Sequence, residues 1–503
     1  MKTATLSKKI YSVKDPIDEH LFSSQVWVVE PSFSLGRLSQ FFDPKTAVKI
    51  SAFLKMRKFK WKAKSHIVFD LSARHKFALL VIPKKLTVFT ALELSREVLS
   101  SVQQEHPSNV LVNLGPISDP SEKILIDSFT SAARVLNYHP PKYKGAPKKK
   151  TEENKKPSDK LLLAFKVSHT RLAQIQKTLH TSETSANKTN LVRYLVQRAG
   201  NDLTPATYVS TATDLAKKAG LKTQFISFSD LQKMKAGAFV AVAQGGGDNS
   251  SGILKIIYEP KTAKRKIALV GKGITFDTGG NNLKTGGHMF GMNNDMAGSA
   301  VVLALCLLAA EEQWPFQITG YLAITENVLT GKAYRPNDVV TSLKGKTIEV
   351  IDTDAEGRMV LADTLTLASK EKPHLVLDFA TLTGSVIRAL GTQYSGGYSN
   401  RKSLLGLIRK AGILSGERVW PFPNDSDYGR CLKSEIADIK QCRLSGGVDH
   451  IEAAYFLSQF VERGVDWVHI DLGAMDPEEP LAHIPKKPSG FGVRFGREFL
   501  HLI

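Results

Sequence analysis

Acidic and basic side chains gather in three short segments of this sequence, each beside an apolar run or a pair of glycines. The segments are VGKGITFDTGGNNLKT, with Lys272, Asp277 and Lys284; MFGMNNDMAGSA, with Asp295; and VIDTDAEGRMVLAD, with Asp354, Glu356 and Arg358. Four carboxylates that converge would repel one another and raise each other's pKa, and one or two divalent cations would remove that conflict. Two metals about 3.5–4 Å apart can lower the pKa of a bound water and polarise a carbonyl group. The segments therefore indicate metal-assisted hydrolysis.

Each of these residues also has an ordinary structural explanation when it is taken alone. An Asp at a strand end is commonly a cap or a turn residue, and Gly271-Lys272-Gly273 by itself is poor evidence for a nucleotide site. The run Asp-Thr-Asp-Ala-Glu-Gly could belong to a calcium loop, but it lacks the ligand spacing and the terminal Glu of such a loop. The sequence has no H-E-x-x-H motif, so the common single-zinc peptidase device is absent.

The elements that must position these side chains alternate between strand and helix. The expected strands are Lys266–Val270, Phe316–Ile324, Thr347–Ile351, His374–Phe379 and Trp467–Leu472, and the expected helices are Met296–Glu312 and Gly357–Lys370. This alternation predicts a largely parallel sheet with helices on both faces. Ligand sites in such sheets lie beyond the carboxyl ends of the strands. The three charged segments are therefore expected to meet at one edge of the sheet.

The front of the chain repeats the α/β alternation. Short apolar runs such as Val26–Val29 and Val110–Leu114 alternate with helix-like stretches such as Ala91–Gln104. The stretch 140–160 is rich in Lys and Pro and is expected to form an exposed loop. We therefore predict a smaller N-terminal α/β domain over 1–170 and a larger C-terminal α/β domain over 171–503, with a mixed, mostly parallel central sheet.

Composition favours a cytoplasmic protein. The first twenty residues contain no continuous apolar stretch, so a secretory signal is not expected. The apolar run Val301–Ala310 is shorter than the roughly 20 residues that span a bilayer, which indicates a buried helix and no membrane partner. The three cysteines, Cys306, Cys431 and Cys442, are too few and too scattered for a disulfide framework, and reduced thiols are expected.

The net charge of +20 comes almost wholly from the front of the chain. Residues 1–200 hold 34 Lys and Arg against 16 Asp and Glu, whereas residues 201–503 hold 34 against 32. The run Lys55–Lys64 (KMRKFKWKAK) alternates lysines with aromatic residues, which as a strand would place Phe59 and Trp61 on one face. Such a stripe could bind single-stranded nucleic acid, including DNA, or phosphates, but a half-buried strand with a solvated lysine face is the favoured interpretation. The Lys148–Lys150 run is expected to be a solvated loop.

Taken together, the three charged segments resemble the leucine aminopeptidase (cytosol aminopeptidase) family. VGKGITFDTGG and DTDAEGRMVLADTL carry the resemblance, which is close over Lys266–Gly397 and looser toward the C-terminus, including SGERVWPFP and EIADIK. Residues 1–180 show no motif of the family. The resemblance implies a metallopeptidase that releases N-terminal amino acids, preferably leucine-like ones, from peptides. It also implies a homohexamer, two divalent metals per subunit (manganese or zinc, with magnesium as a further candidate) and bound bicarbonate.

The resemblance also implies a role for each charged residue. Lys272, Asp277, Asp295 and Glu356 would hold the tighter metal, and Asp277, Asp354 and Glu356 would hold the more exchangeable one. Lys284 would stabilise the oxyanion, and Arg358 would anchor bicarbonate as the general base, since a guanidinium binds such an anion with two parallel hydrogen bonds. As a metal ligand, Lys272 must be neutral, so its pKa would have to be lowered by desolvation and by the adjacent cations.

Substrate contacts are implied for Met292, Thr381, Leu382 and Gly384. Met292, Thr381 and Gly384 would line the pocket for the first side chain, and the carbonyl of Leu382 would accept a substrate N–H. The stretches GGNNLKTGGHMF and LGAMDPEEPLAHIPKKPSG depart from the family pattern, so local loop differences are expected without loss of a ligand. His288 and His450 could be ligands by residue type, although surface or loop histidines are the simpler interpretation.

Two other functions remain open from the sequence. One is a nucleic-acid-binding protein that keeps a peptidase scaffold, since the front of the chain is basic and some members of the family bind DNA. The other is a different two-metal hydrolase, such as a phosphoesterase. The intact set of seven charged residues argues against a purely binding role, and a lysine ligand argues against a phosphoesterase site.

Overall fold

The computed structural model of the protein describes residues 9–12, 22–40, 42–72, 75–103, 109–114, 117, 119–145, 161–167, 172–246, 249–261, 263 and 265–503. The chain forms two compact units, Met1–Asn187 with Pro480–Pro485 and Lys188–Glu479 with Lys486–Ile503. The boundary between them lies within helix α4 (Leu172–Val196). The domain division predicted at residue 170 stays a prediction.

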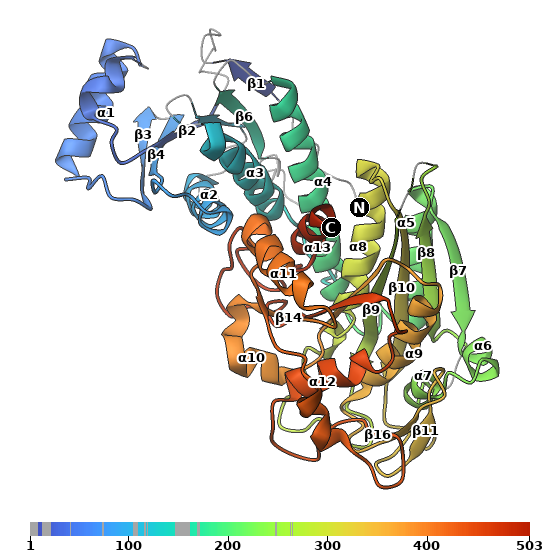
Figure 1. Ribbon diagram of the computed structural model, residues 1–503. Helices are drawn as coiled ribbons and strands as arrows, with labels where there is room; N and C mark the ends of the chain where they lie inside the picture. Colours follow the sequence, from blue (N-terminus) through green and yellow to red (C-terminus); the bar gives the residue numbers. More distant parts are fainter. Residues whose placement is uncertain are drawn as a thin grey trace. The chain divides into compact units, whose positions relative to one another are not determined.

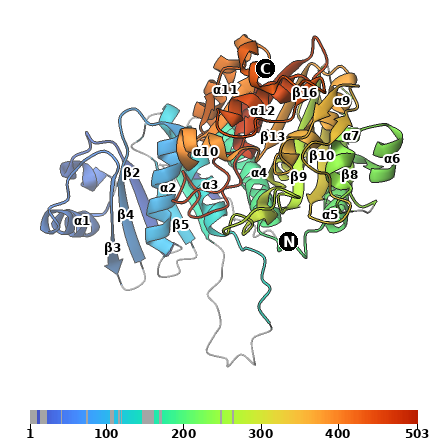
Figure 2. The ribbon, with the colours of Figure 1, turned by 90° about the horizontal axis from the view of Figure 1, so that it is seen from below.

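The first unit is built on a six-stranded sheet in which β3 is antiparallel to its neighbour and the other described strands are parallel. The order is β1 (Lys9–Ser12), β6 (Leu162–Val167), β5 (Asn109–Asn113), β2 (Ser24–Val29), β4 (His75–Val81) and β3 (Ser65–Ser72). Every residue of β2 is buried, as expected for a strand covered on both faces. Helices α2 (Val88–Gln103) and α3 (Asp119–Leu136) cover one face and α1 (Pro44–Met56) covers the other (Figures 1 and 2). The predicted N-terminal α/β fold is confirmed.

The basic stripe at the front of the chain is not a strand, and that expectation was wrong. Helix α1 ends at Met56, and the chain reaches β3 at Ser65 through an irregular connection. Lys58 and Lys64 have positive φ angles of 49° and 67°, which a continuous strand does not allow. The alternation of exposure nevertheless holds, because the lysines are exposed and the aromatic side chains between them pack on the core beside α1.

Part of the predicted Lys- and Pro-rich loop can be described. Residues 140–145 contain no helix or strand, and most of them are exposed. Residues 146–160, with the Lys148–Lys150 run, lie outside the described residues.

The second unit is built on an eight-stranded mixed sheet whose four central strands are parallel. The order is β15 (Val419–Pro421), β14 (Ser395–Ser399), β17 (Asp466–Asp471), β13 (Leu375–Ala380), β9 (Lys266–Asp277), β10 (Gln317–Asn327), β8 (Gly252–Tyr258) and β7 (Lys222–Ser227). A small second sheet contains β11 (Val339–Thr341), β12 (Thr347–Glu349) and β16 (Ile439–Lys440). The predicted mixed, mostly parallel sheet is confirmed.

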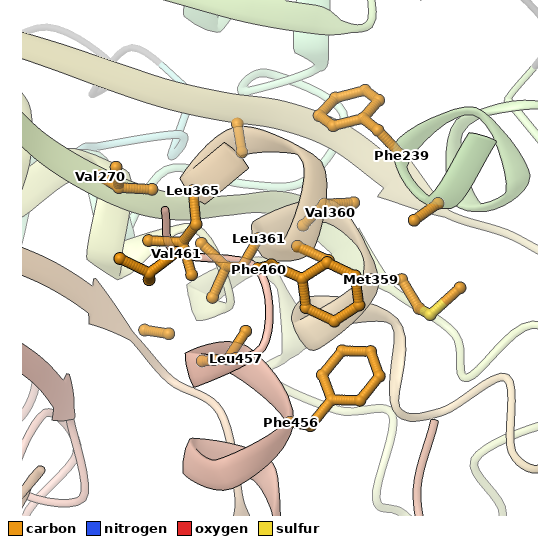
Figure 3. Packing of buried hydrophobic residues seen from close by; sticks show 14 of the residues in the cluster. Phe239, Val270, Met359, Val360, Leu361, Leu365, Phe456, Leu457, Phe460 and Val461 are labelled. Carbon is orange, nitrogen blue, oxygen red and sulfur yellow. The ribbon is translucent and has the colours of Figure 1, made fainter. Parts of the chain in front are cut away.

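Helices cover both faces of this sheet. Helices α7 (Gly237–Ala243), α9 (Glu356–Lys370) and α12 (Asp449–Ser458) share one apolar core with the sheet, where Phe456 and Phe460 pack beneath Leu361 (Figure 3). Helix α8 (Ala297–Glu312) packs on the opposite face against β9, β10 and β13. Further helices of this unit are α5 (Pro205–Lys218), α6 (Phe228–Lys233), α10 (Gly384–Leu390), α11 (Lys402–Ser415) and α13 (Val493–Leu502). Its short 3-10 turns are η4 (Met292–Asn294), η5 (Gly391–Gln393) and η6 (Ser426–Leu432), whereas η2 (Leu35–Gln40) belongs to the first unit.

One helical stretch, Met292–Glu312, is the only one in the described part of the chain that is long and apolar enough to cross a membrane. Its mean hydropathy is 1.4, and 83% of its apolar window is buried inside the protein. The residues Ala297 to Ala309 are all buried, so the stretch is a core helix, as the sequence indicated.

Strand β9 is longer than the sequence suggested. We expected a strand ending at Gly271-Lys272-Gly273, but β9 continues to Asp277 and pairs with β10 throughout this stretch. Gly271 does not form a turn: a Cβ there would lie 2.5 Å from the Cα of Ser299, so glycine is needed for the close approach of α8. Lys272 consequently lies within the strand and not beyond its end.

Candidate active site

A cavity of about 810 Å³ opens in the second unit. Its lining includes every site residue expected from the sequence: Lys272, Asp277, Lys284, Met292, Asp295, Asp354, Glu356, Arg358, Thr381, Leu382 and Gly384. These residues come from three segments between Lys272 and Gly384, and the fold brings all of them to one place.

The parallel strands explain this convergence. Strand β9 carries Lys272 and Asp277 near its carboxyl end, and the neighbouring parallel strand β13 leads into the turn with Thr381. Asp295 lies just before α8, and Glu356 is the first residue of α9. The site is therefore at the carboxyl edge of the central strands, where parallel sheets usually bind ligands.

Lys272 holds two of the carboxylates together. Its Nζ lies 2.8 Å from Asp295 Oδ2 and 2.8 Å from Glu356 Oε1, and it donates to the carbonyl of Thr381 at 3.0 Å. All three charged side chains are at most 7% exposed. A Cβ at Gly357 would lie 2.7 Å from this Nζ, so the glycine that follows Glu356 makes room for the lysine.

The pKa values of Lys272, Asp295 and Glu356 are all raised. Burial works against the charged form of Lys272, but Asp295, Glu356 and Asp277 outweigh it and raise the pKa of the lysine. Burial and the charge of Asp277 raise the pKa of Glu356, and burial also raises the pKa of Asp295. The lowered pKa that we expected for Lys272 as a ligand therefore requires the cations themselves.

Lys284 pairs with the other side of the acid cluster. Its Nζ lies 3.0 Å from Asp277 Oδ2 and 2.6 Å from Asp354 Oδ1. Ligand oxygens of Asp277, Asp354 and Glu356 all lie within 4.8 Å of one another. The two lysines thus supply the positive charge that these carboxylates need in this structure.

The donor set fits divalent cations. Glu356 Oε2 is buried and has no hydrogen-bond partner among the described residues, although a buried carboxylate oxygen is costly without one. Asp277 is oriented by Asn327 Nδ2, which donates to its Oδ1 at 2.8 Å, and by the backbone N–H of Gly279 at 2.9 Å. Carboxylate oxygens of this kind suit magnesium, manganese or zinc. Sequence reasoning missed Asn327, whose only signal is its place at the end of β10.

The departure around Lys284 has a structural role. Asn282 N donates to Thr353 Oγ1 at 2.8 Å, and Thr353 N donates to Asn282 Oδ1 at 3.0 Å. These bonds join the loop that carries Lys284 to the loop that carries Asp354. Asn282 therefore links the two loops, and Lys284 and Asp354 both line the cavity.

Arg358 has a partner that the sequence did not reveal. Its Nη2 donates to Asp449 Oδ1 at 2.8 Å, and its Nη1 donates to the carbonyl of Gln441 at 3.3 Å. Burial disfavours the charged guanidinium, but Asp449 outweighs it and the pKa of Arg358 lies above its ordinary value. Asp449 thus contacts one Nη of the guanidinium, and Arg358 Nε is buried without a hydrogen-bond partner among the described residues.

Asp471 supports the turn that contains Thr381 and Leu382. Asp471 accepts the backbone N–H of Leu382 at 3.0 Å and the hydroxyl of Thr383 at 2.7 Å. Thr381 Oγ1 donates to Asp295 Oδ1 at 2.7 Å, so the turn is tied to the acid cluster as well. Asp471 therefore holds this turn in place, and its role could not be recognised from the sequence.

The two histidines lie in different surroundings. His288 is exposed and lines the cavity. His450 is buried, and its Nδ1 lies 2.7 Å from Ser385 Oγ, so the expectation of a surface histidine was wrong there. The reason is that the start of α12 packs against α10, which buries the side chain of His450.

Known proteins resemble both the sequence and the fold. Residues 190–495 match the cytosol aminopeptidase family, catalytic domain. A probable cytosol aminopeptidase of Rickettsia bellii is 31% identical over 422 residues, covering 83% of this chain and 82% of that protein. One from Streptomyces griseus is 40% identical over 309 residues, covering 61% of this chain and 59% of that protein. A solved structure of the bottromycin maturation enzyme BotP in complex with Mn superposes with a TM-score of 0.79 at 26% identity, covering 95% of this chain and 99% of that one. The chain belongs to the cytosol aminopeptidase family of metal-dependent exopeptidases.

Proposed function

We propose that this enzyme removes the N-terminal residue of peptides with two divalent cations held in the cavity. Lys272, Asp277, Asp295 and Glu356 would hold one cation, and Asp277, Asp354 and Glu356 would hold the other. The observation that carries the proposal is the convergence of four acids around two lysines, Lys272 and Lys284, with Glu356 Oε2 left without a partner among the described residues. Manganese and zinc are the proposed ions, with magnesium as a further candidate.

The chain's own groups divide the work. Bound cations would lower the pKa of a water and polarise the scissile carbonyl. Lys284, whose side chain is 14% exposed beside Asp277 and Asp354, would stabilise the oxyanion. The carbonyl of Leu382 would accept a substrate N–H. Because the substrate amine must reach the acid cluster, only a terminal residue would be released.

The pocket for the first side chain supports an apolar preference. Met292, Thr381 and Gly384 line the cavity, and Met475 and Ile387 add apolar surface to it. We therefore propose that leucine-like residues are preferred. Asp476 and Glu478 also line the cavity from the stretch that departs from the family pattern, so polar contacts are available to longer side chains.

The test is hydrolysis of a leucine chromogenic amide with Mn²⁺ or Zn²⁺. We expect turnover by the unchanged protein and a loss of at least about 100-fold for Asp354→Ala, since a proposed ligand of one of the two cations is removed. Asp466→Ala, whose carboxylate pairs with Arg401 outside the cavity lining, should keep full activity. A panel of N-terminal residues, with metal content measured on the same sample, would define the preference. Absence of turnover in every metal-loaded sample would reject the peptidase proposal.

Further features implied by the resemblance stay predictions. These are the homohexamer, the cytoplasmic location and bicarbonate as a bound anion. The homohexamer would show in the mass of the native particle by light scattering.

DNA binding is a second candidate function. Lys58, Lys60, Lys62 and Lys64 are exposed on the connection between α1 and β3. Changing all four to Glu in the full chain should weaken retention on DNA and flatten its dependence on salt. The same change at Lys217, Lys218, Lys233 and Lys235, which are also exposed, is the matched control. Equal retention by the two variants would reject this candidate.

A further inference from the structure

The peptide group between Thr381 and Leu382 connects two charged side chains. Its carbonyl oxygen accepts a hydrogen bond from Lys272 Nζ at 3.0 Å. Its N–H donates to Asp471 Oδ1, also at 3.0 Å. The C=O and the N–H belong to one planar amide, so the two hydrogen bonds lie at opposite ends of the same dipole. A continuous hydrogen-bonded path therefore runs from the Asp471 carboxylate to the nitrogen of Lys272.

The charge of Asp471 is directed at this turn. Asp471 ends strand β17 and is 1% exposed. Its Oδ1 also accepts the backbone N–H of Thr383 at 3.4 Å, and its Oδ2 accepts the hydroxyl of Thr383 at 2.7 Å. Burial raises the pKa of Asp471, but the charge of His469 and the hydrogen bonds from the turn oppose that rise. Three donors on one carboxyl group favour its ionised form.

Lys272 has one hydrogen-bond acceptor that is not a proposed metal ligand. Among the described residues, its Nζ contacts Asp295 and Glu356, which are proposed ligands, and the carbonyl of Thr381. A neutral amine that binds a cation through its lone pair still has N–H groups to donate. The Thr381 carbonyl is fixed, because Thr381 Oγ1 donates to Asp295 Oδ1 at 2.7 Å. This carbonyl can therefore orient the lone pair of Lys272.

The carboxylate should also change how well the amide accepts. Hydrogen bonds in a chain polarise one another, and a bond to an ionised acceptor is about twice as strong as a neutral one. The Thr381 carbonyl oxygen thereby becomes a stronger acceptor for the lysine N–H, which leaves the lysine nitrogen richer in electrons. A carboxylate behind a metal-binding histidine acts in a similar way.

We propose that Asp471 is a positioning residue of the metal centre. Through the amide of Thr381 and Leu382, its charge orients the Lys272 amine and strengthens it as a ligand of one cation. This inference rests on the proposed two-cation peptidase function. The second proposed cation has no lysine ligand, so the effect should fall on one of the two cations.

The test is a titration of the metal-free protein with Mn²⁺ in the absence of substrate, with free Mn²⁺ followed by electron paramagnetic resonance. Asp471→Asn keeps the shape and can still accept the N–H of Leu382, but it carries no charge. The dissociation constant of one Mn²⁺ should rise about tenfold or more, as for other groups that support metal ligands. The dissociation constant of the other Mn²⁺ should stay nearly unchanged.

Turnover of a leucine amide separates this role from a purely structural one. In Asp471→Asn, the Mn²⁺ concentration for half-maximal turnover should rise by the same factor as the dissociation constant. The KM measured at saturating Mn²⁺ should not change, because the turn keeps its hydrogen bonds. Asp471→Ser is a second neutral variant with a smaller side chain. It should lose at least as much Mn²⁺ affinity, so the test does not depend on how an amide fits in this buried place.

Asp363→Asn is the matched control. Asp363 is also buried, and it accepts the backbone N–H groups of Phe239 at 2.9 Å and Leu343 at 2.7 Å, but it does not line the cavity. This variant loses a buried charge that supports backbone groups away from the site. It should bind both Mn²⁺ ions as the unchanged protein does.

A double variant tests the path through the lysine. If Asp471 acts through Lys272, Asp471→Asn should add little to the loss of Mn²⁺ affinity in Lys272→Met, because coupled residues are not additive. Additive losses would overturn the path through the amide. Unchanged Mn²⁺ affinity in Asp471→Asn, or an equal loss in Asp363→Asn, would overturn the role of Asp471.

Failure of the peptidase function would be seen separately. An unchanged protein that binds two Mn²⁺ ions but releases no leucine would reject that function, and the titrations would still decide the role of Asp471. An unchanged protein that binds no Mn²⁺ would reject the two-cation site and this inference with it.

Discussion

Replacing Lys272 by methionine should lower the free energy of unfolding of the metal-free protein by about 3–5 kcal/mol, the range for breaking a buried ion pair. Lys272 Nζ lies 2.8 Å from oxygens of both Asp295 and Glu356, and the three side chains are at most 7% exposed. Methionine fills nearly the same volume but leaves two buried carboxylates without their cation. The same change removes a proposed metal ligand, so peptidase activity should be lost as well.

Urea unfolding in the presence of a chelator would measure the stability effect. Lys222→Met is the matched control, because Lys222 Nζ lies 3.3 Å from Glu259 Oε2 and the two side chains are 77% and 53% exposed. A pair that faces solvent is worth at most about 1 kcal/mol, so this variant should be nearly as stable as the unchanged protein. Equal losses in the two variants would mean that Lys272 does not hold the acid cluster together.

Activity separates the two roles of Lys272. If the lysine only neutralised the carboxylates, saturating manganese would restore both stability and turnover to the methionine variant, since the cations would supply the missing charge. We expect manganese to recover part of the stability, because ligand binding to the native state raises it. Turnover should remain absent, because the nitrogen ligand is missing.

The charged residues of the site could be predicted from local sequence because each lies in a short and unusual pattern. Asp277, Asp354 and Glu356 stand beside glycines and apolar runs, and the fold brings them within 4.8 Å. What local pattern could not supply was the extent of β9. Gly271 and Gly273 suggest a turn, but they are required by the close packing of α8 on a continuous strand.

The contact of Asp449 with Arg358 could not be predicted, because nothing near Asp449 in the sequence indicates it. An acid at the start of a helix is ordinary, since it complements the helix dipole. Its partner Arg358 is 91 residues away, and the two meet only because α9 and α12 pack on the same face of the sheet. The strand predicted for the basic stripe is wrong for a related reason. Alternation of lysine with aromatic residues is typical of a strand, but here positive φ angles at Lys58 and Lys64 accompany the same pattern without a strand.

The buried pair of Asp378 and His469 should also contribute a large, pH-dependent part of the stability. Asp378 on β13 and His469 on β17 are neighbours in the parallel ladder, and both are fully buried. Asp378 Oδ1 lies 2.5 Å from His469 Nδ1, and its Oδ2 accepts the indole N–H of Trp467 at 2.6 Å. Asp378→Asn keeps an acceptor for Trp467 but removes the negative partner of His469.

The sign of the pH effect follows from the pKa of the histidine. Burial lowers the pKa of His469, but Asp378 outweighs it, and the pKa of His469 is raised above its usual value. A raised pKa in the folded state stabilises the protein fully below the unfolded value of about 6.5, and that contribution is lost as the pH rises through the folded value. Asp378→Asn should therefore cost about 3–5 kcal/mol near pH 6 and clearly less at pH 9.

Urea unfolding at these two pH values would measure the difference. At pH 6 the double variant Asp378→Asn with His469→Gln should lose less unfolding free energy than the two single variants lose in sum, because neither buried charge remains without a partner. His374→Gln, at an exposed histidine whose Nδ1 accepts the backbone N–H of Lys266, controls for general effects of removing a histidine. A loss that is the same at both pH values would show that His469 stays neutral, and that Asp378 acts there only as a hydrogen-bond acceptor.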